Sequence, residues 1–316
     1  MINLTFKQLR YVDALARLGH FGRAADVCAI SQPALSMQIK ELEQSLGTDL
    51  FERGPRQVRL TRFGEEFLTR VRAILRDVDE LQDMARAARA RLTGRLRIGV
   101  IPTVAPYLLP RMIGDLMRAY PDLDIHVRET LTPRLIGELA DGTLDTALVA
   151  LPVSEPALHE VPLFSESFVL PRPMADAGQP VPSRETLREM RLLLLEEGHC
   201  FRDQALSFCN LSTTAPRELL DGSSLSTLVQ MVGAGIGVTL IPEMAVPVET
   251  RSAAVAVARF AAPEPRRTIG MVWRKTTPLA RQLQELAEVI RQAAEAQGLA
   301  VMPALTDPSA GTSSAG

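Results

Sequence analysis

Cysteine and aromatic residues are scarce in this chain of 316 residues, which holds three cysteines and only 4% aromatic side chains. Three cysteines are too few for a structural disulfide framework, so any disulfide is expected to have a transient or sensing role. The sequence also lacks an apolar run of the roughly 20 residues that a membrane span needs, and its start lacks the apolar core of a signal peptide. We therefore expect a cytoplasmic protein with no membrane partner, divided by its length into two or three domains.

Net charge is small as well, at −2 with 23% charged residues. Such a balance excludes a protein that coats nucleic acid without specificity. The charge is uneven, however: residues 1–62 hold nine basic and six acidic side chains, a local net charge of +3, which leaves −5 for the remainder. A mildly basic N-terminal segment on an acidic body permits DNA binding.

Helical patterns occupy residues 6–18, 23–29 and 32–46, with a short turn between the second and the third. Ser31 suits the N-cap of the third helix, and Pro33 suits its first turn, where a missing N–H costs nothing. Its apolar residues recur at spacings of four, three and four and predict one buried face: Leu35, Ile39, Leu42 and Leu46. Its opposite face is polar and carries Gln32, Ser36, Gln38 and Lys40. This pattern predicts a helix-turn-helix.

Two short strand patterns follow at 50–52 and 57–60, around a turn from Arg53 to Arg56, and predict a winged helix-turn-helix. Thr61 is expected to cap a long helix after the wing. Apolar residues at alternating spacings of three and four predict that this helix pairs two subunits as a coiled coil. These residues are Phe67, Val71, Ile74, Val78, Leu81, Ala85 and Ala88.

From residue 94 onward, strand patterns alternate with helical ones, which predicts an α/β domain with a largely parallel sheet. The expected strands are 95–101, 124–130, 145–151, 192–196, 238–241 and 268–273, and the expected helices are 110–119, 132–140 and 225–233. A proline-rich stretch at 170–183 interrupts the pattern, and the strand at 268–273 is expected to return to the first half, giving two lobes with a cleft between them. The predicted domains are 1–62 (winged helix-turn-helix), 63–93 (dimerising linker helix), 94–300 (regulatory domain) and 301–316 (flexible tail).

Several of these segments resemble the LysR-type transcription regulators, over residues 4 to about 298. The N-terminal matches are Phe21-Gly22-Arg23-Ala24-Ala25, the run from Ser31 to Glu43, Leu46-Gly47 and Leu50-Phe51-Glu52-Arg53. The segments 101–110, 198–205 with Cys209, and 264–270 resemble the peroxide-sensing members of that family. The resemblance implies a winged helix-turn-helix, a dimerising linker helix, a two-lobed regulatory domain like the periplasmic binding proteins, and dimers or tetramers on promoter DNA.

Cys200 follows His199 and opens a predicted helix that runs through Phe208. The helix N-terminus and nearby cations such as Arg202 favour a thiolate, the reactive form of cysteine. In a helix, Cys200 and Cys209 are half a turn out of phase and roughly 13 Å apart along the axis. A disulfide needs Cα atoms within about 7 Å. Our hypothesis is that peroxide oxidises Cys200 to a sulfenic acid, that Cys209 then forms a disulfide with it, and that the segment between them refolds.

Peroxide cleavage also needs side chains that hold the two oxygen atoms and supply a proton. By their positions in the resembling motifs, the candidates are Thr103, Thr132, His199, Asp203 and Arg267, with Arg266 as an alternative to Arg267. Cys28 is expected to pack in the core. No metal or other cofactor is expected, because the cysteines have no short-spaced partner ligands.

Base contacts to DNA are predicted for three side chains near the start of the third helix, where glutamine can pair with adenine: Gln32, Ser36 and Gln38. Pro33 is expected to make apolar contact, and Lys40 to contact phosphate. Arg53 and Arg56 in the wing suit phosphate or a narrow minor groove. Further expected partners are other copies of the chain in a homodimer or homotetramer, RNA polymerase, and a thiol reductant of the glutaredoxin or thioredoxin type.

Two other functions compete with a peroxide-switched regulator of antioxidant genes. One is a LysR-type regulator that binds a small metabolite in the cleft between the lobes, with incidental cysteines. The other is a thiol peroxidase, which the cysteine pair alone suggests. Because an enzyme has no need of residues 1–93, we do not expect an enzyme.

Overall fold

The computed structural model describes residues 4–54, 58–88, 91–209 and 220–302. The chain forms two compact units, residues 1–85 and 86–316, which are described separately here. The finer division into four segments stays a prediction, and the tail proposed at 301–316 lies outside the described residues from 303 onward. Among the described residues, no helix is both long enough and apolar enough to cross a membrane.

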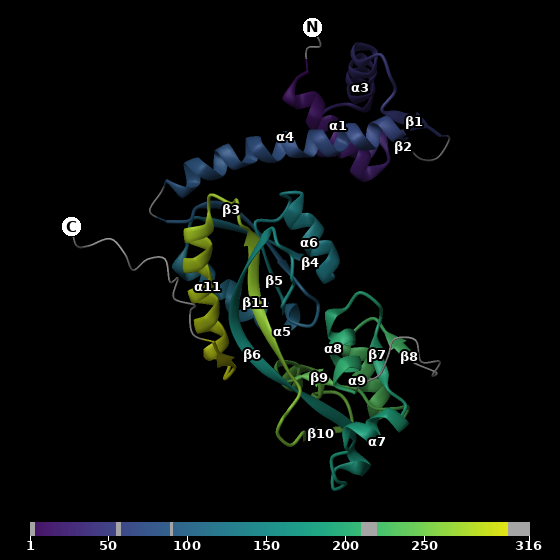
Figure 1. The fold of residues 1–316 in the computed structure, drawn as a ribbon, viewed down its shortest axis with the longest axis vertical. Helices are drawn as coiled ribbons and strands as arrows, with labels where there is room; N and C mark the ends of the chain where they lie inside the picture. The colour runs from purple at the N-terminus through teal and green to yellow at the C-terminus, as the bar shows by residue number, and fades with distance from the viewer. Residues whose placement is uncertain (1–3, 55–57, 89–90, 210–219, 303–316) are drawn as a thin grey trace, which may run out of the picture. The chain divides into compact units, whose positions relative to one another are not determined.

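Unit one is a helix-turn-helix with a wing, as predicted (Figure 1). Its elements are α1 (Phe6–Leu18), α2 (Phe21–Val27), α3 (Gln32–Leu46), β1 (Phe51–Arg53), β2 (Val58–Leu60) and most of α4 (Arg62–Ala87). The second helix begins at Phe21, two residues before the predicted start, because the His20 ring nitrogen Nδ1 accepts hydrogen bonds from the backbone N–H groups of Gly22 and Arg23. Histidine is not a usual N-cap, so the sequence rules missed it.

The third helix has the predicted cap and the predicted buried face. The Ser31 hydroxyl accepts from the N–H of Ala34, and Leu35, Ile39 and Leu42 are buried. Cys28 ends α2 and packs, partly buried, against the same core. Burial raises the pKa of the Cys28 thiol, so the thiol form is favoured there.

The wing is an antiparallel hairpin in which Phe51 lies opposite Leu60. Glu43 in α3 is buried and accepts hydrogen bonds from the N–H groups of Leu50 (2.9 Å) and Phe51 (3.1 Å), which ties the recognition helix to the wing. Thr61 caps α4 as expected, accepting from the N–H of Gly64 at 2.9 Å. A side chain at position 64 would stand 2.1 Å from the carbonyl oxygen of Leu50, so this close approach requires glycine.

Unit two is built on an eight-stranded sheet whose strand order is β10-β6-β11-β5-β3-β4, with β9 and β12 also paired to β6. The strands are β3 (Gly94–Val100), β4 (Leu123–Glu129), β5 (Thr146–Leu151), β6 (Leu158–Pro173), β9 (Ile241–Pro242), β10 (Val255–Arg259), β11 (Arg266–Arg274) and β12 (Ala300–Val301). The prediction of a largely parallel sheet is wrong, because only β3 pairs in parallel, with β4 and β5, and every other pairing in this sheet is antiparallel.

The error comes from β6, a strand of 16 residues that the sequence analysis left out. The proline-rich stretch that begins at residue 170 suggested an interruption, but a proline removes only one N–H and is tolerated in a strand where that N–H has no ladder partner. The expected interruption at 170–183 therefore begins after Pro173, with the short helices η1 (Met174–Asp176) and α7 (Arg184–Glu189). The return of β11 to the first half, beside β5, is confirmed.

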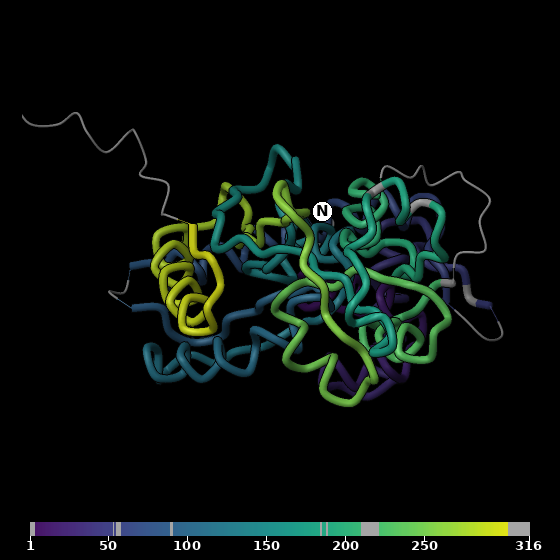
Figure 2. The backbone as a smooth tube through the Cα atoms, turned by 90° about the horizontal axis from the view of Figure 1, so that it is seen from below, coloured from purple at the N-terminus to yellow at the C-terminus, as the bar shows by residue number. Residues whose placement is uncertain are grey.

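Two lobes share β6 (Figure 1). Residues 158–167 of β6 pair with β11 in the first lobe, and residues 169–173 pair with β10 in the second. Helices α5 (Ala105–Ala119), α6 (Thr132–Ala140) and α11 (Ala280–Glu295) belong to the first lobe. The second holds β7 (Leu193–Leu195), α8 (Cys200–Phe208), β8 (Leu220–Gly222), α9 (Leu225–Gly233), η2 (Glu243–Ala245) and α10 (Val246–Glu249). In both backbone views α11 and the α8–α9 segment lie at opposite ends of the unit (Figures 1 and 2).

Helix α5 begins at Ala105, five residues before the predicted start at Pro110. The rule that places proline in a first turn applies here to Pro106, while Pro110 lies inside the helix. The segment predicted as a strand at 238–241 contributes only the bridge from Val238 to Leu192 and the first residue of β9.

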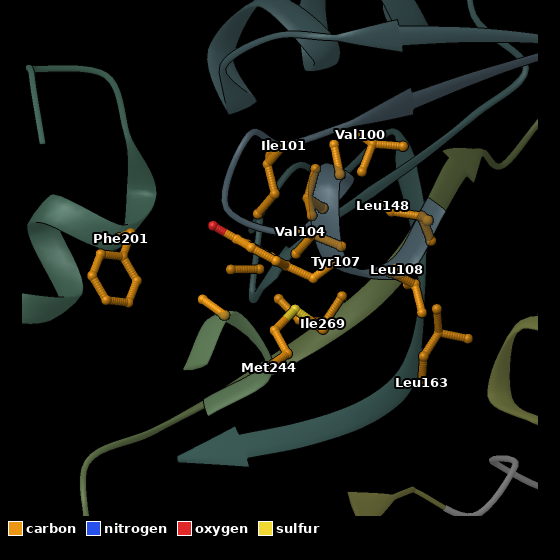
Figure 3. Close-up of a cluster of buried hydrophobic side chains, with 14 of the residues drawn as sticks. Val100, Ile101, Val104, Tyr107, Leu108, Leu148, Leu163, Phe201, Met244 and Ile269 are labelled. Atoms are coloured by element: carbon orange, nitrogen blue, oxygen red, sulfur yellow. The ribbon is translucent and has the colours of Figure 1, made fainter. Parts of the chain in front are cut away.

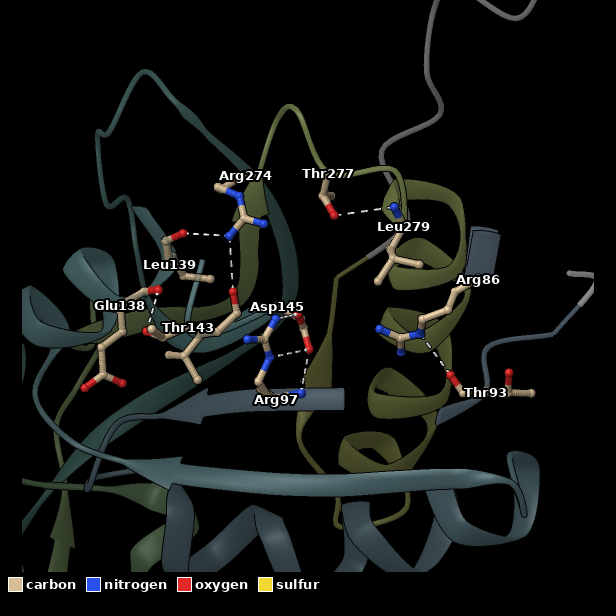
Figure 4. Close-up of polar contacts among 11 residues, drawn as sticks. Arg86, Thr93, Arg97, Glu138, Leu139, Thr143, Asp145, Arg274, Thr277 and Leu279 are labelled. Atoms are coloured by element: carbon tan, nitrogen blue, oxygen red, sulfur yellow. Dashed lines mark hydrogen bonds and ion pairs between the residues drawn. The ribbon is translucent and has the colours of Figure 1, made fainter. Parts of the chain in front are cut away.

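Packing and polar contacts hold the first lobe together. Figure 3 shows side chains such as Val100, Leu108 and Leu148 in its core, with Phe201 supplied by α8 of the second lobe. Figure 4 shows Arg97 at β3 bound to Asp145, which precedes β5; Asp145 accepts from the backbone N–H of Arg97 at 2.7 Å and from its guanidinium at 2.6 Å. This pair fixes the parallel strands whose C-terminal ends carry the loop of Thr103.

Candidate thiol pocket and DNA-contacting helix

Cys200 and Cys209 stand at the two ends of α8. Cys200 is its first residue and Cys209 its C-cap, and neither of the two forms a disulfide. The predicted helix between them is confirmed, so the nine residues separate the cysteines by about 13 Å along the axis. Cys200 is half-buried, whereas Cys209 is completely buried. A disulfide between them therefore requires α8 to come apart.

A narrow pocket adjoins Cys200, and its walls lie so close together that it has no space for a water molecule in this conformation. Three parts of the chain meet there: the loop after β3, the start of α6 and the start of α8. The lining residues are Ile101, Pro102, Thr103, Leu131, Thr132, His199, Cys200 and Phe201. The structure thus brings together Cys200 and three of the predicted site residues, Thr103, Thr132 and His199. The Thr132 hydroxyl is buried and has no hydrogen-bond partner among the described residues.

Arg267 is the inward-facing member of the arginine pair, and Arg266 is exposed. The Arg267 guanidinium donates from Nη1 to the Thr103 hydroxyl at 2.8 Å and from Nη2 to the Thr103 carbonyl at 2.9 Å. It also lies over the ring of Phe201, with 5.4 Å from Cζ to the ring centroid. Arg267 therefore stands directly behind the pocket wall that Thr103 and Phe201 form.

His199 precedes α8 at its N-cap position and is buried. Burial lowers the pKa of its imidazole, against an opposing effect of the Glu196 carboxylate. The neutral ring offers one N–H donor and one acceptor nitrogen. His199 is thus suited to hydrogen bonding in the pocket and not to supplying a fixed positive charge.

Two polar side chains at the start of α8 have other surroundings than the pocket. Asp203 is exposed and is not among the residues that line the pocket, so its part in the peroxide reaction stays a prediction. Arg202 does not face the thiol as a free cation, because its guanidinium donates to the carbonyl of Leu195 at 2.7 Å and to Asp221 at 2.6 Å. Arg202 instead fastens α8 to β7 and β8.

The sequence analysis missed Glu166 and Phe201. Glu166 lies directly opposite Arg267 in the antiparallel register of β6 and β11, and its Oε1 accepts from Arg267 Nε at 2.8 Å. Phe201 packs edge-on against Phe168, with ring centroids 4.9 Å apart. The available signal for Glu166 was a carboxylate in a short polar stretch, residues 165–167, with apolar residues on both sides.

Among the described residues, no three His, Cys, Asp or Glu side chains lie together in a group that could hold a metal ion.

The polar face of α3 is available to a ligand. Gln32, Pro33 and Lys40 are exposed, and Ser36 and Gln38 are half-buried. The Gln38 amide donates to Glu41 at 2.8 Å, so it must change partner to reach a base. The Arg53 backbone lies in β1, and Arg56 is outside the described residues. The exposed Met37, between Ser36 and Gln38, adds an apolar contact that the sequence analysis did not consider.

Known proteins match nearly the whole chain. The bacterial regulatory helix-turn-helix proteins of the LysR family match residues 6–65, and the LysR substrate binding domain matches residues 89–295. The chain is 44% identical over 290 residues to a probable hydrogen peroxide-inducible genes activator of Streptomyces viridosporus, covering 90% of this chain and 93% of the relative. It is 42% identical over 292 residues to the DNA-binding transcriptional dual regulator OxyR of Escherichia coli, covering 91% and 95%.

Solved OxyR structures have the same fold. A full-length OxyR variant from Pseudomonas aeruginosa aligns with a TM-score of 0.73 at 37% identity, covering 92% of this chain and 95% of that one. A mutant OxyR of Corynebacterium glutamicum with hydrogen peroxide bound aligns with a TM-score of 0.63 at 36% identity, covering 93% and 94%. The predicted family and the two-lobed fold class are confirmed. The chain belongs to the LysR family of DNA-binding transcription regulators, in the group formed by the OxyR proteins.

Proposed function

We propose that this chain is a transcription regulator that senses hydrogen peroxide through Cys200 and Cys209 and changes the transcription of antioxidant genes. One observation carries the proposal: Cys200 opens α8 in a small polar pocket while Cys209 is buried at the other end of the same helix. Relatives named as hydrogen peroxide-inducible activators, which the chain covers almost completely, support the same signal.

The polar groups that line the pocket match hydrogen peroxide, a small molecule with two O–H donors and two acceptor oxygens, and the pocket walls must separate to admit it. The Thr103 hydroxyl accepts from Arg267, which leaves its own proton to donate to a peroxide oxygen. The Thr132 hydroxyl has no other partner among the described residues, and neutral His199 adds a donor and an acceptor. These groups hold the O–O bond near Cys200 and stabilise the charge that develops on the leaving oxygen.

The chemistry proceeds in two displacements. The Cys200 thiolate attacks one peroxide oxygen, the O–O bond breaks, and the departing hydroxide takes a proton and leaves as water, so that Cys200 becomes a sulfenic acid. The Cys209 thiolate then attacks the Cys200 sulfur, and the sulfenic hydroxide leaves as a second water. The two thiols lose two electrons in all, and peroxide gains them. A cellular thiol reductant of the glutaredoxin or thioredoxin type reverses the change.

The second displacement couples oxidation to conformation. Cys209 reaches Cys200 only when α8 unwinds, which removes Phe201, Ala205 and Leu206 from the core. The reduced and oxidised chains thus hold two different packings of one segment, as a switch requires.

The readout of the switch is DNA binding by an oligomer. In α4, Ile74 and Leu81 leave 43% and 65% of their surface exposed in the single chain, which favours pairing of α4 with a second copy. The paired helix-turn-helix units place α3 in successive major grooves of promoter DNA, with Gln32, Ser36 and Gln38 at the bases. The refolded segment rearranges the dimer or tetramer and its contact with RNA polymerase in the cytoplasm.

A count of free thiols tests the proposal. One equivalent of peroxide should lower the number of free thiols in the wild-type chain from three to one. The Cys28→Ser variant should also lose two thiols. In Cys209→Ser, Cys200 should stop at a trappable sulfenic acid, and Cys200→Ser should lose no thiol and no longer switch promoter output. An unchanged count in the wild-type chain would instead favour a regulator that binds a metabolite between the lobes.

A further inference from the structure

Glu166 and Arg267 form an ion pair that the solvent does not reach. Their side chains are 1% and 0% exposed, and both come from long central strands at directly opposed positions. Burying two charges is costly unless each has well-placed partners, so the pair is expected to have a specific purpose. Its position behind Thr103 suggests that purpose.

Arg267 donates three hydrogen bonds, one from each of its nitrogen atoms. Nε donates to Glu166 Oε1 at 2.8 Å, Nη1 donates to the Thr103 hydroxyl at 2.8 Å, and Nη2 donates to the Thr103 carbonyl at 2.9 Å. Nη2 also lies 2.8 Å from Glu166 Oε1 in the ion pair. Arg267 is therefore held on one side by Glu166 so that its other side faces the pocket wall.

The second oxygen of Glu166 extends this support into the second lobe. Oε2 accepts the backbone N–H of Met244 at 3.1 Å, at the start of η2. One carboxylate oxygen thus binds the Arg267 guanidinium, and the other binds the Met244 amide, which holds the Glu166 side chain in place. A glutamine at this position would keep the shape but lose the charge that orients Arg267.

We propose that Glu166 is a positioning residue for the reaction of Cys200 with peroxide, acting through Arg267 without touching peroxide itself. This inference rests on the proposed function of the thiol pocket. Glu166 keeps the Arg267 guanidinium and the Thr103 hydroxyl in the one arrangement that polarises the peroxide oxygens. A displaced guanidinium leaves the polar groups of the pocket misaligned, and misplacement of about 1 Å can slow a reaction by about a hundredfold.

The test compares two reactions of the same thiol in full-length chains that carry Cys28→Ser. One is the second-order rate constant of Cys200 oxidation by hydrogen peroxide. The other is the second-order rate constant of Cys200 alkylation by iodoacetamide, a reaction that does not depend on side chains that orient two peroxide oxygens. Glu166→Gln should lower the ratio of the two rate constants by about tenfold to a hundredfold. A merely structural role for Glu166 would slow or speed both reactions together and leave the ratio within about twofold of wild type, which would overturn the proposal.

A second variant keeps the test decisive if Glu166→Gln does not fold. Glu166→Asp preserves the charge but shortens the side chain, and it should lower the ratio by an intermediate factor, whereas an unchanged ratio contradicts the proposal. In Glu166→Gln with Arg267→Gln, the ratio should match that of Arg267→Gln alone within about twofold. A further drop as large as that of the single Glu166 variant would show that Glu166 does not act through Arg267.

Glu243 supplies a matched control. It also carries an ion pair with an arginine, Arg259, and it adjoins Met244, but it is partly exposed and has no contact with Arg267. Glu243→Gln should therefore leave the ratio unchanged. If the wild-type chain itself fails to lose two thiols, the proposed function falls, whereas normal wild-type oxidation with an unchanged ratio in both Glu166 variants removes this inference alone.

Discussion

Replacing Phe201 by leucine should make the Cys200–Cys209 disulfide harder to reduce. Phe201 is buried in α8, edge-on to Phe168, and it leaves this site if α8 unwinds on oxidation. Leucine has three fewer carbon atoms, so the substitution removes about 1–2 kcal/mol of packing from the reduced chain, after partial relaxation. The oxidised chain, in which the side chain is already displaced, loses little of this stabilisation.

The difference is measurable as a reduction potential. For a two-electron couple about 1.4 kcal/mol corresponds to 30 mV, so the potential should become more negative by about 20–40 mV. The assay is an equilibrium titration of the purified chain against a thiol redox buffer, with the oxidised fraction read by alkylation and mass. Because the measurement is made at equilibrium, any effect of Phe201 on the rate of peroxide entry does not disturb it.

Phe164→Leu provides the comparison, because Phe164 is equally buried but lies in β6, away from α8. It should lower the free energy of unfolding by a similar amount in both oxidation states and leave the potential unchanged. If Phe201→Leu destabilises the reduced chain but its potential stays within about 10 mV of wild type, then Phe201 keeps its packing on oxidation and the argument for unwinding α8 is refuted.

Three further predictions concern acid, the wing and DNA. Because burial lowers the pKa of His199, the unfolded chain binds a proton there more readily than the folded one, so the free energy of unfolding should fall between pH 7.5 and about pH 5.5. Urea denaturation should show a smaller fall in His199→Gln, and an identical fall would disprove a role for this group. Glu43→Ala should lower the free energy of unfolding by about 1–3 kcal/mol because it removes the acceptor of the Leu50 and Phe51 N–H groups, and a loss below about 0.5 kcal/mol in thermal unfolding would contradict this. Lys40→Ala should reduce the salt dependence of DNA binding by about one ion, whereas Lys275→Ala, an exposed lysine of unit two, should not; equal slopes in fluorescence titrations would exclude a phosphate contact for Lys40.

Local sequence rules sufficed where local interactions decide the structure. The bounds of α3 followed from Ser31 at the cap and from apolar residues in helical spacing, and the helical segment between Cys200 and Cys209 was predicted in the same way. The start of α2 was not, because the His20 ring as a cap depends on a side-chain orientation that a residue type does not specify.

Long-range pairing was the part that the sequence did not reveal. The direction of β11 and the existence of β6 depend on contacts between residues about 100 positions apart, such as Arg267 with Glu166. The sequence also could not distinguish Arg266 from Arg267. Successive side chains of a strand point to opposite faces of the sheet, but which face is inward depends on long-range contacts. Arg202 and Asp203 fit the chemistry of a thiolate site by their types, yet Arg202 is bound to Leu195 and Asp221, and Asp203 is exposed.

Strand β6 continues through both lobes and pairs with β11 and β10 without any residue of α8. If α8 unwinds on oxidation as proposed, we expect these strands to keep their hydrogen bonds. Amide hydrogens of β6 and β11 should accordingly exchange with solvent at the same slow rates before and after oxidation, whereas those of α8 should lose their protection. The exchange rates of the sheet amides therefore provide an internal reference against which a change in α8 on oxidation can be measured.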